Sequence, residues 1–314
     1  MGLFTGGTLD RGASQNPRHV TESDTMMMNP LMISSQDEYP HAPFENPQWR
    51  EGYHFNAYDE DCRKALSISI GIRPALGIRE EVISLHGDLR LVYVGASTLK
   101  ENPLASGTFN MEPVDPLRSW NIHINDSFHD VGGGSADSLQ QMKVEVAFES
   151  GEPVLGYSTD RGDRYEQPGS LSGDIHLGHE DIPFRGRGMR DHSWEVRDMS
   201  VWKEWYSLMS CAPGITMFLS LFKSDSTTTW EGWLKEKDYS YVKTLDMVPT
   251  FSSGQLTQCQ VQAGTSETQV DVLSTVLSHI FLSTGKPEST LEETLVQVDG
   301  GYGVLWHGRT HLVD

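Results

Sequence analysis

The sequence predicts an all-β protein made of two antiparallel β-barrel or sandwich units packed together, with little helix. Three observations support this fold class. Apolar and polar residues alternate along many short segments, which is the pattern of half-buried strands. Clusters of Gly, Asn, Asp and Pro separate these segments at hairpin spacing, as at 132–134 and 252–254. At 314 residues the chain is long enough for two domains, and a dozen or more short strands are typical of barrels and sandwiches.

The expected strands can be placed in order along the chain. Apolar residues occupy every second position in 68–72, 120–124 and 144–148. The other segments with a strand pattern are 51–59, 89–94, 215–222, 229–234, 239–245, 258–262 and 304–312. Two segments, 274–282 and 287–294, are the candidates for helix, although the first is rich in β-branched residues, which favour strands.

The chain divides into three predicted parts. Residues 1–45 have little periodicity and are expected to form an extended N-terminal arm that packs onto the body or is partly disordered. The run Met26-Met27-Met28 is interpreted as a docking contact of this arm rather than a set of ligands. Two β domains are expected to follow, at 46–196 and 197–314, with a seam near 196–212.

Composition excludes several classes of function. The chain has 24 Lys and Arg against 44 Asp and Glu, for a formal net charge of −20. Nucleic acids and anionic membrane surfaces attract clustered basic residues, so neither is an expected partner. The three cysteines, Cys62, Cys211 and Cys259, are far apart and lack CxxC spacing. We therefore expect neither a disulfide framework nor a zinc knuckle.

The location of the protein is also constrained. No apolar run approaches the ~20 residues of a membrane span. Residues 1–16 lack the basic patch and apolar core of a secretory signal. We expect a soluble, cytoplasmic protein without an integral membrane segment, and a homodimer stays open.

The most unusual segment is 186–198, which contains one His, two Asp, one Glu, one Trp and three Arg. Charges at this density survive folding only if they pair or face a cavity, and both conditions are typical of an active site. In an extended strand, Arg190, His192 and Trp194 share one face. Asp191 and Glu195 share the other face.

His192 is the predicted proton carrier, because it lies beside an aromatic side chain on its own face. Asp191 or Glu195 would orient His192 or share its proton. Asp191 nevertheless points away from His192, and is expected to hold Arg190, Arg197 or a loop amide. The alternative is that the whole segment is a salt-bridge cluster at a domain junction.

A second unusual strand is 51–59, where hydrogen-bonding side chains replace apolar ones on one face. We predict that this face, made of His54, Asn56 and Tyr58, lines a pocket shared with the charged segment. Glu51 has the parity of the opposite, apolar face and is expected at the mouth of the pocket. The alternative is a strand that faces solvent. The predicted substrate-binding residues are Glu51, His54, Asn56, Tyr58, Trp120, Arg190 and Trp194.

The remaining motifs are weak. His176 and His179 lie near Glu180, but without the helical spacing of a HExxH zinc site. The glycines at 132–134 are not followed by Lys-Ser or Lys-Thr, so they do not form a phosphate loop. No GxSxG elbow is present. We therefore expect no metal and no cofactor.

Two regions carry a resemblance to known proteins. Residues 186–194 (GRGMRDHSW), preceded by 172–175 (SGDI), resemble the Gly-x-Gly-x-x-Asp-His-x-Trp region of a lipocalin-like superfamily. That superfamily includes carotenoid hydratases (hydroxyneurosporene synthases), tocopherol cyclases and lipocalin-like Diels–Alderases. Residues 49–59 (WREGYHFNAYD) and 70–74 (IGIRP) are similar to the opening strands of one branch of it.

The resemblance implies two lipocalin-like β units with a pocket near their interface, and cofactor-free chemistry on an apolar substrate. The branch usually reads Arg-Asp-His-Ser-Trp-Gly-x-Arg-Asp-Trp. This chain departs from the pattern at two positions: Glu195 replaces the usual Gly, and Met199 replaces the usual Trp. Glu195 is therefore either an additional acid or base, or an ion-pair partner of Arg197 or Arg187. Members of the superfamily differ in reaction, so the resemblance does not identify the substrate.

Two functions follow from these observations. The first is a lyase or isomerase of the hydratase or cyclase type. It would act on a terpenoid-like, polyketide-like or aromatic small molecule, and acid–base cleavage of a carbon–carbon bond stays open. The second is a carrier that binds the same kind of molecule without turnover. A carrier has no need for titratable groups such as His192 and Glu195 beside an apolar cavity.

Overall fold

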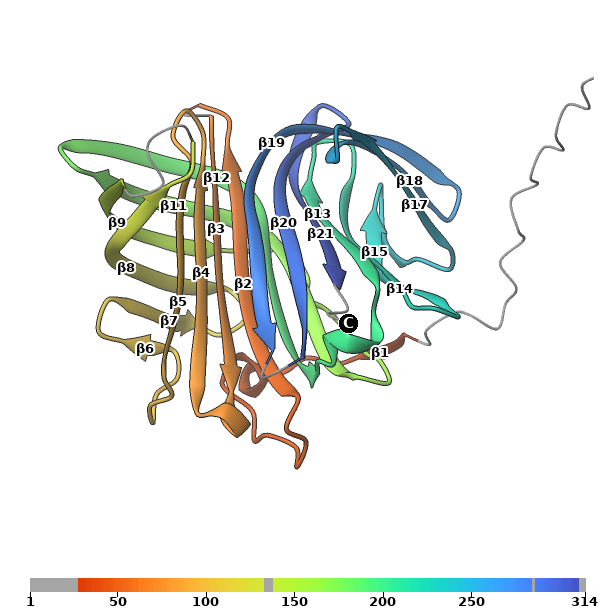
Figure 1. The fold of residues 1–314 in the computed structure, drawn as a ribbon, viewed down its shortest axis with the longest axis horizontal. Helices are drawn as coiled ribbons and strands as arrows, with labels where there is room; N and C mark the ends of the chain where they lie inside the picture. The colour runs from red at the N-terminus through yellow and green to blue at the C-terminus, as the bar shows by residue number, and fades with distance from the viewer. Residues whose placement is uncertain (1–27, 62, 133–137, 284–285, 311–314) are drawn as a thin grey trace, which may run out of the picture.

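The computed structural model describes residues 28–61, 63–132, 138–283 and 286–310, and shows two antiparallel β-sheets side by side (Figure 1). Helical structure in these residues is limited to three short 3-10 turns: η2 (Ser35–Glu38), η3 (Pro74–Leu76) and η4 (Met199–Val201). The predicted all-β class is confirmed. Among the same residues there is no helix with the length and apolar character that a membrane crossing requires.

The first sheet contains the N-terminal half of the chain, and most of it closes into a barrel. Its strands are β1 (Asn29–Leu31), β2 (Trp49–Asp59), β3 (Lys64–Arg73), β4 (Ile78–His86), β5 (Leu91–Thr98), β6 (Ala105–Ser106), β7 (Phe109–Asp115), β8 (Ser119–Asp130), β9 (Leu139–Glu149), β10 (Leu155–Ser158), β11 (Gly162–Leu177) and β12 (Glu180–Val196). Because β9 pairs with both β8 and β11, the strands β11, β12, β2, β3, β4, β5, β8 and β9 form a closed ring.

The second sheet contains the C-terminal half and stays open as a half-barrel. Its strands are β13 (Glu204–Cys211), β14 (Thr216–Lys223), β15 (Thr228–Lys235), β16 (Tyr239–Tyr241), β17 (Leu245–Ser252), β18 (Gln255–Ala263), β19 (Ser266–Ser283), β20 (Lys286–Val298) and β21 (Gly301–Thr310). The order across the sheet is β16-β15-β14-β13-β21-β20-β19-β18-β17. The chain passes from the barrel to the half-barrel between Val196 and Glu204.

The two segments predicted as candidate helices, 274–282 and 287–294, are strands. They lie in β19 and β20, which pair with each other along most of their length. The physical reason is tertiary. The segment 274–282 pairs with β20, and β20 pairs with β21 on its other side. This cross-strand pairing outweighs a local pattern that resembles a helix. The β-branched residues of 274–282 were the sequence signal that favoured this outcome.

The barrel interior is filled by side chains, as an eight-stranded barrel allows. Its core includes the fully buried Phe55, Trp120, Phe148 and Leu171. A smaller apolar cluster between the sheets joins Tyr157 and Met189 of the barrel to Met209, Phe218 and Trp233 of the half-barrel. The barrel therefore holds a packed apolar core, and a second apolar cluster joins the two sheets.

Part of the predicted N-terminal arm is described, and it contacts both sheets. Strand β1 pairs with β10 at the barrel edge. Met28 packs against the interface cluster and the half-barrel core, and its sulfur accepts a hydrogen bond from Gly232 N at 3.0 Å. This contact agrees with a docking role for the methionine run. Residues 1–27, including Met26 and Met27, lie outside the described residues.

Candidate active site

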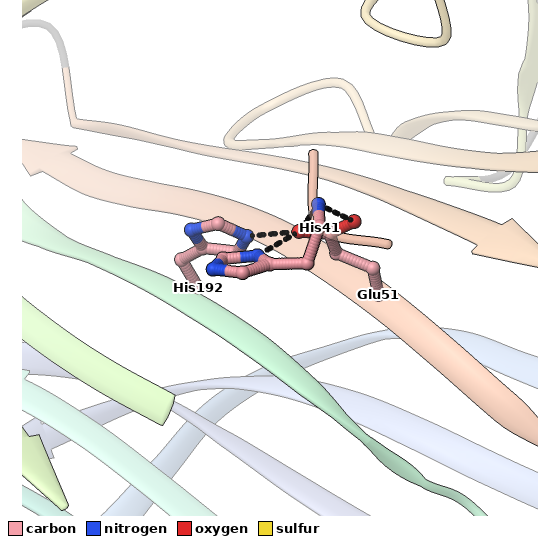
Figure 2. Close-up of side chains that lie close together, drawn as sticks. All are labelled: His41, Glu51 and His192. Carbon is pink, nitrogen blue, oxygen red and sulfur yellow. Dashed lines mark hydrogen bonds and ion pairs between the residues drawn. The ribbon is translucent and has the colours of Figure 1, made fainter. Parts of the chain in front are cut away.

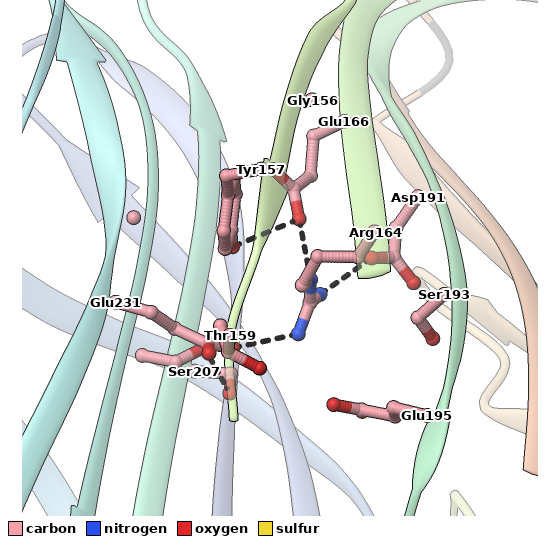
Figure 3. A network of polar contacts seen from close by, with 12 residues as sticks. Gly156, Tyr157, Thr159, Arg164, Glu166, Asp191, Ser193, Glu195, Ser207 and Glu231 are labelled. Carbon is pink, nitrogen blue, oxygen red and sulfur yellow. Dashed lines mark hydrogen bonds and ion pairs between the residues drawn. The ribbon is translucent and has the colours of Figure 1, made fainter. Parts of the chain in front are cut away.

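Strand β12 distributes its unusual side chains over its two faces. Arg190, His192 and Trp194 point into the barrel, where the Arg190 guanidinium lies over the rings of Trp120 and Phe148, 5.9 and 5.7 Å from their centroids. Residues 191, 193 and 195 point toward the half-barrel (Figure 3). The alternation has the period of 2 that an extended strand imposes. The predicted site residues are consequently split between two environments.

A cavity of about 190 Å³ lies between the sheets, on the outer face of β2 and β12. Engineered cavities of about 150 Å³ bind benzene, so this space is large enough for an aromatic ring. The half-barrel contributes an aromatic wall made of Trp205, Phe218, Phe222 and Trp306. The barrel contributes polar and charged side chains: Arg50, His54, Glu80, Arg161, Arg164, Asp191, Glu195 and Arg197.

The carboxylates of β12 that face this cavity are held by arginines. Asp191 Oδ2 accepts a hydrogen bond from Arg164 Nη2 at 2.5 Å. Arg164 also donates to Glu166 at 2.8 Å and reaches Glu231 of the half-barrel at 2.7 Å (Figure 3). The prediction that Asp191 holds Arg190, Arg197 or a loop amide is therefore wrong. Arg190 lies on the other face of β12, whereas Arg164 comes from the neighbouring strand β11.

Glu195 is an ion-pair partner, as one of the two sequence hypotheses expected. Its carboxylate accepts hydrogen bonds from Arg197 Nε at 3.0 Å and lies 3.5 Å from Arg161 Nε. Burial alone would raise the pKa of Glu195, but the two guanidinium groups outweigh it and lower the pKa to about 2. Glu195 is thus ionised at neutral pH and poorly suited to donate a proton.

His54 is the histidine that lines this cavity. It is 92% buried, since only 8% of its surface is exposed. Its Nε2 has no hydrogen-bond partner among the described residues. The imidazole meets the Trp306 ring edge to face, with 4.8 Å between centroids. Burial lowers the pKa of His54, and the nearby carboxylates of Glu293 and Asp191 oppose this shift.

Glu293 is a cavity residue that sequence reasoning missed, because 287–294 was considered a helix candidate. It lies on β20 and accepts hydrogen bonds from Trp306 Nε1 at 2.8 Å and Ser67 at 3.2 Å, as well as from Ser84. His86 Nε2 lies 3.1 Å from it. Burial would raise the pKa of Glu293, but its contacts with His86 and Ser84 lower it to about 2. Glu293 therefore ties the half-barrel to the barrel as a fixed negative charge.

His192 lies inside the barrel and makes contacts at both ring nitrogens. Its Nε2 lies 2.8 Å from Glu51 Oε1, and its Nδ1 lies 3.3 Å from the Tyr165 hydroxyl. His41 Nδ1 contacts the same Glu51 oxygen at 2.7 Å (Figure 2). The rings of His41 and Trp194 are stacked, with centroids 3.9 Å apart. Glu51 thus contacts His192 of the charged segment, but neither His192 nor Trp194 lines the cavity.

This cluster is also the group in the described residues with the donor types of a metal site. The ligand atoms of His41, Glu51 and His192 lie within 4.8 Å of one another. His41 contributes its backbone nitrogen as well, which donates to both oxygens of Glu51 at 3.0 and 3.1 Å. The carboxylate is thus already satisfied by hydrogen bonds. His176, from the weaker motif, contacts Asp181 at 2.6 Å on the surface.

Arg190 and Trp120 belong to a second buried cluster, at the end of the barrel closed by η2. The guanidinium of Arg190 donates to both oxygens of Glu38, at 2.6 and 3.0 Å. Trp120 Nε1 and the Tyr165 hydroxyl donate to the same carboxylate, at 2.5 and 2.7 Å. These side chains hold η2 in the barrel, and they lie outside the cavity between the sheets.

Asn56 and Tyr58 face the half-barrel but lie beyond the cavity. Asn56 Nδ2 contacts the Met209 sulfur at 3.0 Å. The ring of Tyr58 stacks on Tyr302, with centroids 3.8 Å apart. Of the ten predicted site residues, His54, Asp191 and Glu195 share the cavity. The prediction that Glu51, His54, Asn56 or Tyr58 shares a cavity with His192 or Trp194 is therefore wrong for this cavity, which His54 lines without either of them.

Comparison with known proteins places the chain in a family. Residues 34–311 match the model of a family described as a domain of unknown function, DUF7064. The chain belongs to the DUF7064 family. Since the match includes β2 to β21, it covers both sheets and the cavity between them. A comparison with curated protein sequences gave no match to this DUF7064 chain.

Solved structures share the fold of this DUF7064 protein. An AttH protein from Nitrosomonas europaea is 12% identical, with a TM-score of 0.56, over 87% of this chain and 98% of that one. Kievitone hydratase from Nectria haematococca is 9% identical, with a TM-score of 0.58, over 88% and 93%. CghA is 12% identical, with a TM-score of 0.53, over 85% and 89%. The resemblance to the lipocalin-like superfamily is confirmed as a likeness of fold.

Proposed function

We propose that this protein is a cofactor-free acid–base enzyme that adds or removes water, or rearranges bonds, on an apolar small molecule held between the two sheets. The observation that carries the proposal is the unpartnered Nε2 of His54. A buried polar atom without a hydrogen bond costs about 1–3 kcal/mol, and this one, unlike most of the unpartnered buried atoms of the described residues, belongs to a side chain that lines the cavity. A substrate or its attacking water would supply the missing partner.

The environment of His54 suits a general base. Burial keeps the imidazole neutral, so Nε2 can accept a proton at neutral pH. In a hydration, Nε2 takes a proton from water as the water oxygen bonds to one carbon of a polarised double bond. The imidazolium then returns that proton to the neighbouring carbon. The sum adds one water and leaves His54 unchanged, and the reverse sequence removes water.

Two features of the cavity support this proposal. The aromatic wall from the half-barrel offers contact to an apolar substrate and excludes bulk water. The similar structures include one titled kievitone hydratase and one of CghA with Sch210972. Both bear on this chain through their fold alone, and they favour a small-molecule enzyme without specifying its substrate.

A carrier with the same cavity is the second candidate. The fixed ion pairs of Asp191 and Glu195 are compatible with a carrier, because these carboxylates are already held by arginines. The unpartnered nitrogen of His54 favours the enzyme, since a pocket used only for apolar binding gains nothing from an unsatisfied polar atom.

The proposal is tested by incubating the purified protein with a panel of prenylated and aromatic compounds, followed by mass analysis. We expect at least one compound to gain or lose one water, or to rearrange at constant mass, at a rate proportional to enzyme concentration. Compounds that bind in a thermal-shift assay but are recovered unchanged across the panel would favour the carrier.

The pH dependence of any turnover follows from the lowered pKa of His54. The base is active when neutral, so kcat/KM should be level near pH 7 and fall on the acid side, with its midpoint below the ordinary histidine value of 6.5. Folding stability changes in the same direction. The unfolded chain takes up the His54 proton near pH 6.5 and the folded chain only at lower pH, so stability declines as the pH falls through this window. An acid limb centred above 6.5 would contradict the assignment.

A further inference from the structure

Arg50 lies on the floor of the cavity, across two facing glycines. Gly52 on β2 pairs with Gly71 on β3, and both leave the barrel surface bare at this point. A Cβ at Gly52 would come within 2.5 Å of Arg50 Nη1, and a Cβ at Gly71 would collide with the Nη2, Nε and Cζ atoms. The absence of side chains at these two positions is what allows the guanidinium to lie flat.

Most of the hydrogen-bonding capacity of Arg50 is unused. A guanidinium has five N–H donors. In the described part of the chain, Arg50 donates from Nε to Glu80 Oε2 at 3.1 Å, and its two terminal amino groups have no protein acceptor. Glu80 is shared with Arg73, which donates to its other oxygen at 2.6 Å. Only 12% of the Arg50 side chain is exposed, so its free donors face the cavity rather than bulk solvent.

The surroundings of Arg50 favour an incoming negative charge. Arg197 lines the same cavity, and its own carboxylate partner, Glu195, is shared with Arg161. Burial lowers the pKa of Arg197; Glu195 opposes this shift, while the like charge of Arg50 adds to it. The carboxylates that line the cavity already have partners: Glu80, Asp191 and Glu195 are each bound to an arginine, and Glu293, from the half-barrel, lies 3.1 Å from His86 Nε2.

We propose that Arg50 anchors a carboxylate of the ligand, so that the cavity takes apolar or aromatic acids. The free terminal amino groups can bind a carboxylate through two parallel hydrogen bonds. The apolar body of the acid would lie along the wall formed by Trp205 and Phe222. Arg50 and His54 share one face of β2, with their Cα atoms roughly 13 Å apart along the strand. The anchor therefore holds the acid group away from the reacting carbon.

This inference rests on the proposed function only in that both place the ligand in the same cavity. Its test therefore measures binding and not turnover. Isothermal titration calorimetry on the full chain uses two probes with the same carbon skeleton, 3-phenylpropanoate and 3-phenylpropan-1-ol. We expect the wild-type protein to bind the acid more tightly than the alcohol. R50M should weaken acid binding by at least about tenfold, equivalent to ~1.4 kcal/mol, and leave alcohol binding unchanged.

Two further variants separate the anchor from a general effect of charge. Arg73→Met removes the other guanidinium on Glu80 but no group that lines the cavity, so acid binding should be retained. Gly71→Ala keeps every charge but pushes a methyl group into the Arg50 guanidinium, so it should weaken acid binding selectively. Thermal melts of all variants identify any that fail to fold, and R50K serves as a folded substitute for R50M because it keeps the charge and loses the fork.

The inference is overturned if wild-type protein binds the two probes equally or does not bind the acid at all, or if Arg73→Met weakens acid binding as much as R50M. Failure of the proposed function gives a different pattern. If Arg50 is required for preferential binding of the acid but no compound in the panel is converted, the anchor proposal is supported and the enzyme proposal is not. Conversely, if the protein converts neutral compounds and R50M does not change that turnover, the proposed enzyme is supported and the proposed anchor is not.

Discussion

His54→Leu should reduce turnover of any substrate found by about 10²- to 10⁴-fold, or ~3–5 kcal/mol of activation free energy, because a positioned general base typically contributes this much. The unfolding free energy should stay level or rise. Leu fills a similar volume, and the change removes a buried nitrogen that has no partner. Steady-state kinetics and urea denaturation on the same preparation measure the two effects.

His192→Gln is the informative comparison, because sequence reasoning chose His192 as the proton carrier. The structure gives His192 contacts to Glu51 and Tyr165 and no place in the cavity. We therefore expect His192→Gln to melt earlier and still turn over substrate. His129→Gln, on the barrel surface, should change neither property. If the His192→Gln protein folds but has no turnover while the His54→Leu protein stays active, the catalytic residue is His192, inside the barrel, and not His54.

The largest expected effect on stability belongs to Glu38. Its carboxylate accepts hydrogen bonds from Trp120, Tyr165 and both terminal amino groups of Arg190, and none of its surface is exposed. Glu38→Ala would leave a buried guanidinium unpaired, which costs about 3–5 kcal/mol. Urea denaturation should show this as a lower midpoint. The matched control is Glu45→Ala, which removes an exposed carboxylate of the same segment.

The double variant Glu38→Leu with Arg190→Met tests the reason for this loss. Removing both charges together leaves no unpaired ion, so much of the stability should return. If the double variant is as unstable as Glu38→Ala, the contribution of Glu38 comes from the packing of η2 in the barrel end. If the Glu38→Ala protein is as stable as wild type, the hydrogen bonds to Glu38 contribute nothing to the free energy of unfolding.

The alternation of apolar and polar residues was sufficient to predict the fold class and the faces of the unusual strands. The alternation along β12 correctly separated Arg190, His192 and Trp194 from Asp191 and Glu195, because successive side chains of a strand point to opposite sides of its sheet. The same rule placed His54, Asn56 and Tyr58 on one face of β2. These inferences needed no partner strand, since a period of 2 is a property of a single extended chain.

Which of these faces meets the second sheet depends on how the two sheets pack, and no local pattern reports it. A strand shows the same alternating pattern whether one of its faces lines a filled barrel or a cavity. For this reason the predicted pocket combined His192 with residues that lie on the opposite side of β12. Arg164, the partner of Asp191, comes from β11, Arg161 beside Glu195 lies in the turn before β11, and Trp306 comes from β21. Their proximity arises from the pairing of distant strands and the packing of two sheets, and neither has a local signature in the chain.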